Sequence, residues 1–342
     1  MRTRRLKAFT FIVGLLPLAS PASVSGQTRA MVQDPSLDNL RHPAEYRAGA
    51  PRSLGAVVTG GSGSRSMILI AGLGFGASIF DGFAAQHARE FRTYAVTLPG
   101  FGGTAAPPMP TGDSAVFANA AWTRWAMRGV LNLMDSLRIG RATVVAHWIG
   151  ASQIASRLAI EHPDRVDAVI LLAGVAKSYY DSDTTMLRWT AAQRARYAEG
   201  IGTQWFRTVT QRTWDDNNFM PYDYAVNPLT AQLLWREAAS PSLATWIRYL
   251  LEFYATDVTA DFARLKVPTL VVQPGFDDPD FFVEPGRNYM RNLTHDSWRD
   301  VERAPGAVEF VTVPMSRTFI MHDQPAALDR ALTPFLSRVV RL

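Results

Sequence analysis

The alternation of apolar runs with helix-like segments constrains the fold of this chain more than any other feature of the sequence. Runs rich in Val, Ile and Leu recur at 55–61, 66–73, 92–100, 142–147, 166–174, 268–275 and 308–314. Segments whose apolar residues recur with helical spacing, such as 78–91 and 121–137, separate most of them. Because strands that are apolar throughout and alternate with helices are typical of a mostly parallel sheet with both faces covered, the sequence predicts an α/β fold. Only a Gly/Ser turn separates the first two runs, which predicts a β-hairpin.

One long segment, residues 176–261, breaks this alternation. It contains five of the nine tryptophans of the chain, and its pattern indicates helices without a parallel strand. We interpret it as a helical cap inserted between two parts of the core, 50–175 and 262–342. Such a cap would lie over the carboxyl ends of the strands, where open α/β sheets bind ligands. Packing accounts for most of its aromatic side chains, and several are expected to line an apolar pocket.

The first 26 residues have the three parts of a secretory signal peptide. Four basic residues among the first seven precede an apolar run at 8–18, and small residues follow up to Gly26. We therefore expect removal of residues 1–26, a linker at 27–49, and a mature protein exported to the periplasm or outside the cell. The apolar run is short for a bilayer span, so an uncleaved anchor is the less favoured alternative. Removal of the signal lowers the formal net charge from +5 to about +1.

Composition and motifs exclude several classes of function. The chain has no cysteine, which rules out thiol catalysis and zinc sites built on cysteine. The mature part has no Lys/Arg cluster typical of nucleic-acid binding, no dinucleotide or Walker fingerprint, and no further apolar run of about 18 residues that could span a membrane. Asp277, Asp278 and Asp280 lack the spacing of a calcium loop. We therefore expect no cofactor, no metal ion and no nucleic-acid partner.

Several short motifs occur in a fixed order along the chain. They are Ala71-Gly72-Leu73-Gly74, Leu98-Pro99-Gly100-Phe101-Gly102, VVAHWIGAS at 144–152, His162-Pro163-Asp164-Arg165-Val166 and Gly275-Phe276-Asp277-Asp278-Pro279. Each stands beside an expected strand where the α/β-hydrolase family has a corresponding motif, and together they resemble that family over about residues 50–342. The resemblance is to capped members similar to esterases and epoxide hydrolases. It implies an α/β-hydrolase fold, with a mostly parallel sheet flanked by helices and an inserted helical cap.

Two of the three catalytic positions implied by the resemblance carry unsuitable residues. The strand-to-helix turn of the family reads G-x-S-x-G and has Trp148 in place of the nucleophile, while Thr318 holds the position of the catalytic histidine. The acid position retains Asp278. An indole is no nucleophile and threonine does not titrate near neutral pH, so neither can replace the residue that is lost. Because a triad works as a unit, Asp278 alone is not expected to support acyl transfer.

The same alignment predicts the geometry of this degenerate triad. Trp148 should lie at the turn with a positive φ, which is rare for a bulky residue. Its indole should fill part of the pocket under the cap, near cap aromatics or Phe319. Asp278 and Thr318 should converge on Trp148 across the edge of the sheet. We further expect that Trp148→Ser combined with Thr318→His restores slow turnover of an activated ester.

Other groups around the turn offer few substitutes for the lost residues. The oxyanion hole of the family is made of backbone, so the N–H groups of Leu73 and Ile149 are expected to persist as an anion- or ligand-binding pair. His147 should point away from the pocket, and His322 should lie at the rim of the final helix. The hydroxyl of Ser152 should pack or bond back to the helix backbone.

These observations leave three hypotheses for function. The favoured one is an exported protein that binds a small apolar molecule or a partner without catalysis. The second is an active hydrolase of esters or epoxides, or a lyase, that uses residues outside these motifs. The third is a copy that has drifted and has no present role. Since a fold does not by itself confer an activity, the geometry of the site has to distinguish them.

Overall fold

The computed structural model describes residues 54–178, 184–210, 212–213, 221–281, 289–302 and 306–339. The predicted signal peptide (1–26) and linker (27–49) lie outside the described residues. Within the described part of the chain, no helix is both long and apolar enough to cross a membrane.

A seven-stranded sheet forms the centre of the molecule, in the order β1-β3-β2-β4-β5-β6-β7. The strands are β1 (Val57–Gly60), β2 (Arg65–Ile70), β3 (Phe91–Val96), β4 (Ala142–His147), β5 (Val166–Leu172), β6 (Thr269–Pro274) and β7 (Val308–Val313). All neighbouring pairs are parallel except β1 with β3. The central strands β4 and β6 are buried at every residue, as expected for a sheet covered on both faces. The prediction of a mostly parallel α/β fold is confirmed.

The predicted hairpin between the first two strands is wrong. β1 pairs with β3, with Val57 opposite Val96, and β3 separates β1 from β2. The turn after β1 passes the start of β3, where the Ser62 N–H donates to the Ala88 carbonyl at 2.8 Å. The physical reason is burial: residues 67–70 of β2 are inaccessible and take a central place between parallel neighbours, whereas the largely exposed β1 suits an edge.

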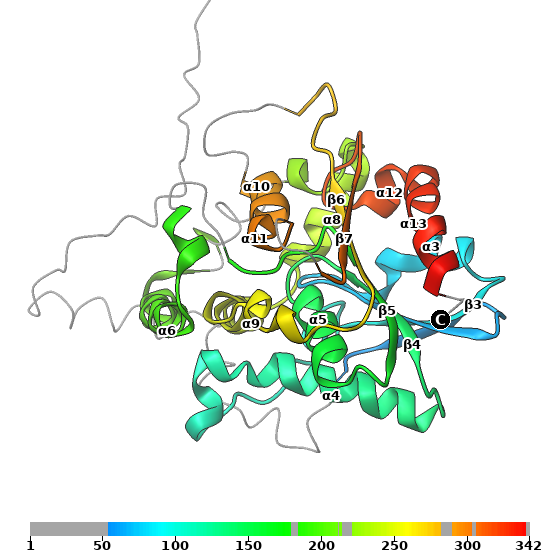
Figure 1. Cartoon of the computed structure of the whole chain (residues 1–342). Helices are drawn as coiled ribbons and strands as arrows, with labels where there is room; N and C mark the ends of the chain where they lie inside the picture. Colours follow the sequence, from blue (N-terminus) through cyan, green and yellow to red (C-terminus); the bar gives the residue numbers. More distant parts are fainter. Residues whose placement is uncertain are drawn as a thin grey trace, which may run out of the picture.

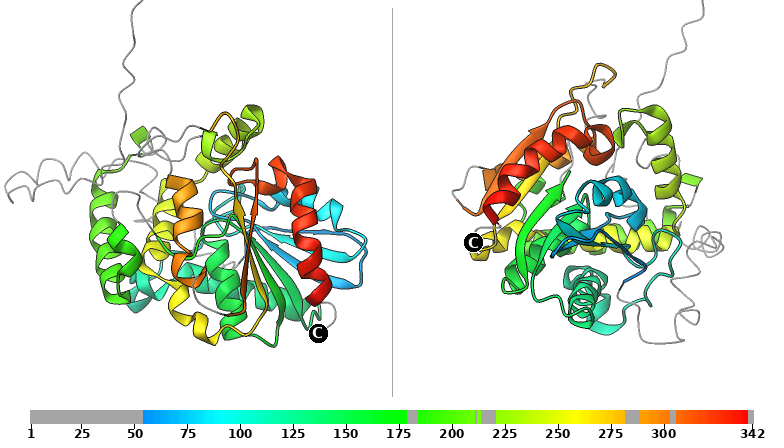
Figure 2. Two further views of the ribbon diagram at one scale, coloured as in Figure 1. Left: turned by 45° about the horizontal axis from the view of Figure 1, so that its top comes forward. Right: turned by 90° about the vertical axis from the view of Figure 1, so that its right-hand side faces the viewer.

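Helices cover both faces of the sheet (Figures 1 and 2). α4 (Ala121–Ser136) and α5 (Ala151–Glu161) lie on one face, and α3 (Asp81–Gln86) and α13 (Pro325–Val339) lie on the other. The remaining short elements of the core are η3 (Ala77–Phe80), η4 (Gly112–Ala115), η5 (Phe117–Asn119), α10 (Tyr289–Asp296), α11 (Arg299–Glu302) and α12 (Ile320–Asp323). α5 buries nine of its eleven residues against the sheet and neighbouring helices. Its first turn is therefore held firmly at the carboxyl end of β4.

The segment predicted to form a cap is helical in its described residues. It contains η6 (Thr184–Arg188), α6 (Ala191–Thr208), η7 (Pro221–Asp223), α8 (Pro228–Ala239) and α9 (Leu243–Ala255), and η8 (Val258–Arg264) crosses its predicted end at residue 261. Side-chain caps define the helix starts: Thr190 and Gln193 form a capping box before α6, Asn227 caps α8, and Ser242 caps α9. Every residue of α9 is buried, because it packs on α6, α4 and η5. The cap therefore rests on the core along α9, which Figure 1 shows between α6 and α5.

Candidate active site

The turn between β4 and α5 has the strained geometry predicted for it. Trp148 has φ 62° and Gly150 has φ 78°. The Trp148 N–H donates to the Leu172 carbonyl of β5 at 2.9 Å, and the Trp148 carbonyl accepts from the Ser152 N–H at 3.2 Å. A left-handed backbone at a bulky residue costs about 1–3 kcal/mol, so the surrounding structure has to hold it in place. The prediction of a positive φ at Trp148 is confirmed.

The Trp148 side chain is fully buried in a cluster of aromatic rings. Its ring centroid lies 6.0 Å from that of Phe75, in the loop after β2, and 6.1 Å from that of the cap residue Tyr224. Phe319 completes the cluster, with its centroid 4.7 Å from Phe75 and 5.8 Å from Tyr224. All four rings are inaccessible to solvent. The indole therefore fills space between core and cap, as predicted, and its burial contributes about 2–3 kcal/mol.

Asp278, the residue predicted to hold the acid position, is bound by an arginine. Arg317 Nη2 lies 2.6 Å from Asp278 Oδ1, and Arg317 Nε lies 2.9 Å from Asp278 Oδ2, so the pair is bidentate. Both residues are 3% exposed. Arg317 Nη1 also donates to the cap carbonyl of Tyr222 at 2.7 Å, and the guanidinium lies 4.4 Å from the centroid of the Tyr222 ring. Both oxygens of Asp278 are thus engaged by a buried cation that also holds the cap.

Thr318 bonds to the cap instead of completing a triad. Its hydroxyl donates to the Asp223 carbonyl at 2.7 Å, and its own carbonyl lies 3.2 Å from His147 Nε2. Trp148, Asp278 and Thr318 do follow β4, β6 and β7 at one edge of the sheet, as the alignment predicts. The two side chains expected to converge on Trp148 are nevertheless held by other partners: Asp278 by Arg317, and Thr318 by Asp223.

The oxyanion prediction needs a correction at Leu73. The Leu73 N–H donates to the Ile149 carbonyl at 3.2 Å, and that carbonyl also accepts from the Ala151 N–H at 2.9 Å. The Leu73 side chain is fully buried against the turn, where a Cβ on Gly150 would lie 2.6 Å from Leu73 Cδ2. A buried N–H needs an acceptor, and the turn itself supplies one here. The role assigned to the Ile149 N–H stays a prediction.

The histidines and the serine near the turn have structural partners. His147 is fully buried with its ring centroid 4.4 Å from that of Phe319, and burial lowers its pKa to about 3, against the opposing effect of the hydrogen bond to Thr318. It is therefore neutral at pH 7. Ser152 Oγ donates back to the Trp148 carbonyl at 2.5 Å, which confirms the bond predicted for it. His322 Nε2 lies 2.9 Å from the Ile79 carbonyl.

Two carboxylates that the motifs did not indicate also join the cap to the core. Glu237 on α8 accepts from the Gly76 N–H at 2.7 Å, and Asp323 accepts from the backbone N–H groups of Arg317 at 2.8 Å and Val226 at 2.9 Å. Burial raises the pKa of both carboxyl groups. The available signal was a single carboxylate in each helical segment, which does not identify a partner. Among the described residues, no three His, Asp or Glu side chains are grouped so as to hold a metal ion.

Comparison with known proteins places this geometry in a family. A sequence profile described as the alpha/beta hydrolase family matches residues 67–331, which is most of the chain. The chain belongs to the α/β-hydrolase family. The correspondence of Trp148 to the nucleophile position of the family stays a prediction of the sequence alignment.

Similarity to individual members is weaker. Two pimeloyl-[acyl-carrier protein] methyl ester esterases match, one from Photorhabdus laumondii at 27% identity over 36% of this chain and one from Pectobacterium carotovorum at 30% over 34%. The matches span 42% and 39% of those two proteins. Among solved structures, the enol-lactonase of Burkholderia xenovorans has a TM-score of 0.58 at 17% identity, covering 84% of this chain and all of that one. An esterase of Thermogutta terrifontis has a TM-score of 0.59 at 17% identity, covering 85% and 98%. These likenesses show the fold.

Proposed function

We propose that this protein is an exported, non-hydrolytic member of the α/β-hydrolase family that acts by binding a small molecule or a partner. The observation that carries the proposal is the bidentate pair between Asp278 and Arg317, in a chain whose strand-to-helix turn carries Trp148. In a working triad the carboxylate holds a histidine, and that histidine activates the nucleophile. Here the carboxylate holds a guanidinium, which stays charged and cannot act as a general base.

Each component of the hydrolytic machinery has acquired a structural contact. Trp148 packs among rings, Thr318 bonds to the cap backbone, and the Leu73 N–H is satisfied by the turn. A drifting copy is expected to leave unsatisfied polar groups where catalytic residues were lost, because an unpaired buried group is costly. Arg317 instead makes a bidentate ion pair and bonds to two cap carbonyls. The bonds of Arg317 therefore favour a maintained, non-catalytic protein over the hypothesis of drift, although the buried Nδ1 of His147 has no hydrogen-bond partner among the described residues.

The packed centre also bears on where a ligand would bind. A small apolar molecule beneath the cap would have to displace the ring of Trp148 or move Tyr224, since both are fully buried. Cap movement would break the bonds of Arg317 and Thr318 to the cap backbone. We therefore infer that binding takes place either after the cap is displaced or at another surface of the protein.

Export is part of the same proposal and has its own test. Secretion in the native host, followed by N-terminal sequencing of the exported fraction, is expected to give a mature start between Ser23 and Ala30. A retained Met1 in that fraction would contradict cleavage.

The non-hydrolytic function is tested with mature protein, a fluorophosphonate probe and p-nitrophenyl esters of two to eight carbons. We expect no labelling and no turnover above buffer, with a serine esterase run in parallel as a positive control. Turnover that survives Trp148→Ala would overturn the proposal and favour the second hypothesis. Glu237→Gln would then be the next variant, because burial raises the pKa of the Glu237 carboxyl against the opposing effect of the hydrogen bond from the Gly76 N–H.

A further inference from the structure

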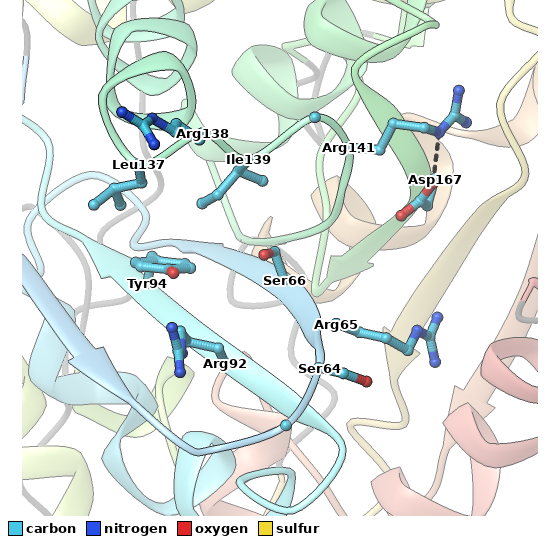
Figure 3. A pocket seen from close by; sticks show the side chains of 12 residues that line it. Ser64, Arg65, Ser66, Arg92, Tyr94, Leu137, Arg138, Ile139, Arg141 and Asp167 are labelled. Carbon is cyan, nitrogen blue, oxygen red and sulfur yellow. Dashed lines mark hydrogen bonds and ion pairs between the residues drawn. The ribbon is translucent and has the colours of Figure 1, made fainter.

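A basic groove lies at the edge of the sheet opposite Trp148. Its volume is about 540 Å³. It is lined by residues 63–66 at the start of β2, by Arg92 and Tyr94 of β3, by the connection 137–141 between α4 and β4, and by Asp167 of β5 (Figure 3). Because β2 to β5 are parallel, this amino-terminal edge is far from the turn that follows β4. We name it the arginine groove.

Four arginines and a single carboxylate line the arginine groove, so its lining carries a clear excess of positive charge. Asp167 is paired with Arg141, whose Nε lies 2.6 Å from its Oδ1. Arg65 stacks on the Phe91 ring, with its guanidinium carbon 4.5 Å from the ring centroid. Within the ranges that the structure describes, the guanidinium groups of Arg92 and Arg138 form no hydrogen bond or ion pair. Two cations at the groove therefore remain available to a ligand.

The backbone at Arg138 is a second, independent observation. Arg138 has φ 56° and follows the last turn of α4. Its N–H donates to the Asp135 carbonyl at 3.1 Å, and the Ile139 N–H donates to the Met134 carbonyl at 2.7 Å. These two bonds form a Schellman motif, in which the left-handed position normally holds glycine. An arginine at this position is strained, and glycine would relieve the strain, so the side chain is retained at a cost to stability.

The chemistry of the lining indicates the class of ligand. Guanidinium groups match phosphate and carboxylate oxygens with paired N–H donors, and a site with several of them is best neutralised by a group that carries more than one negative charge. The hydroxyls of Ser64, Ser66 and Tyr94 lie beside the arginines and can add hydrogen bonds. Leu137, which is 44% exposed, adds an apolar wall next to Tyr94. The groove has room for an organic group attached to the anion.

We propose that the arginine groove binds an organic phosphate ester, either free or as the headgroup of an anionic lipid. The proposed ligands of the phosphate ester are the guanidinium groups of Arg92 and Arg138, which are unpaired among the described residues and lie on either side of Tyr94 and Leu137, while Arg65 and Arg141 add positive charge. This inference does not depend on the loss of hydrolysis, because the groove and the turn at Trp148 lie at opposite edges of the sheet. Failure of one proposal leaves the other standing.

The test compares a groove variant with a charge-matched control. The groove variant is Arg92→Ala with Arg138→Gly, and the control is Arg196→Ala with Arg236→Ala, two exposed arginines on cap helices α6 and α8. Calorimetric titration with inositol hexakisphosphate and glycerol 3-phosphate covers the free source. Co-sedimentation with phosphatidic acid vesicles, against phosphatidylcholine vesicles, covers the lipid source. Binding is measured at about 50 and about 200 mM salt, because contacts to phosphate weaken strongly over this range.

We expect wild-type binding to at least one source, weaker at the higher salt concentration. The groove variant should lose about tenfold or more in affinity, and the control should stay close to wild type. Arg138→Gly alone should raise the melting temperature while lowering affinity, which separates a ligand role from a structural one. The proposal is overturned if wild type binds neither source, if the control loses as much affinity as the groove variant, or if Arg138→Gly lowers the melting temperature.

Discussion

The ion pair between Asp278 and Arg317 gives the sharpest prediction about stability. Arg317→Met removes the cation and keeps an unbranched side chain of similar length, while Asp278→Asn removes the charge and keeps the shape. Both positions are 3% exposed, so neither charge can turn to water when its partner is lost. The single variants therefore test what an unpaired charge costs at this site, and the double variant tests what remains when both charges are gone.

The magnitude follows from burial and bonding. Removal of one partner of a buried ion pair costs about 3–5 kcal/mol, because the other charge is left uncompensated. Arg317→Met also removes the bonds from Nη1 to the Tyr222 and Ala225 carbonyls, which are 2.7 and 3.4 Å long and together contribute about 1–2 kcal/mol. The double variant loses these hydrogen bonds to the cap but leaves no unpaired buried charge at either position. It should be destabilised by only about 1–2 kcal/mol, well below the sum of the single variants.

Urea denaturation at pH 7 measures all four members of this double-mutant cycle. Thermal denaturation of the same variants should show a fall of about 5–15 °C in the melting temperature of Arg317→Met for a protein of this size. Hydrogen exchange at the Phe319 N–H, which donates to the Tyr224 carbonyl at 2.9 Å, should report loosening of the cap in the same variant. Additive single effects would refute the reasoning, because they would mean that the two charges do not compensate each other.

Two further predictions concern the packing around the turn. Gly74 has φ +94°, and a Cβ there would lie 2.5 Å from the buried ring of Trp246. Gly74→Ala should therefore lower the free energy of unfolding, measured by urea denaturation, by about 2 kcal/mol or more. The control Gly82→Ala should be neutral or stabilising, because a Cβ at Gly82 would have no atom within 4 Å. Because burial lowers the folded-state pKa of His147 to about 3, the unfolded chain binds one more proton between its own pKa, about 6.5, and pH 3. The stability supplied by neutral His147 is therefore complete above about pH 6.5 and declines by about 1.4 kcal/mol per pH unit as the pH falls towards 3. His147→Leu should remove this part of the slope between pH 6 and 4, and an unchanged slope would show that His147 is not the group responsible.

Local pattern was sufficient for much of the fold. The runs at 142–147 and 166–174 predicted β4 and β5 because buried parallel strands are apolar throughout, and the small residues around Trp148 predicted the strained turn. The position of β1 at the edge of the sheet could not be predicted from local pattern. A short turn indicates that two strands are adjacent in sequence, and only the competition for the buried centre of the sheet decides which strands become neighbours in space.

At the candidate site, too, the sequence predicted where the residues lie along the sheet but not which side chains they contact. Motif spacing brought Trp148, Asp278 and Thr318 to one edge of the sheet, since each follows a parallel strand. The partner of Asp278 depended on the reach of a long side chain, which spacing does not encode. The sequence shows a cation, Arg317, next to Thr318, but it does not show which carboxylate that cation binds. The contact between Leu73 and Ile149 involves only backbone and has no comparable signal.

The pair between Asp278 and Arg317 also changes what is needed to restore hydrolysis. With Trp148→Ser and Thr318→His alone, the new histidine would compete for a carboxylate whose two oxygens already accept from Arg317 at 2.6 and 2.9 Å. Without that carboxylate the imidazole is neither oriented nor stabilised as it gains a proton. Adding Arg317→Gly releases Asp278 and removes a cation that would disfavour a protonated histidine. We therefore expect the triple variant, and not the double one, to turn over p-nitrophenyl acetate slowly, and Asp278→Ala in the triple background to abolish that turnover. Equal activity of the double and triple variants would show that Arg317 does not block the acid position.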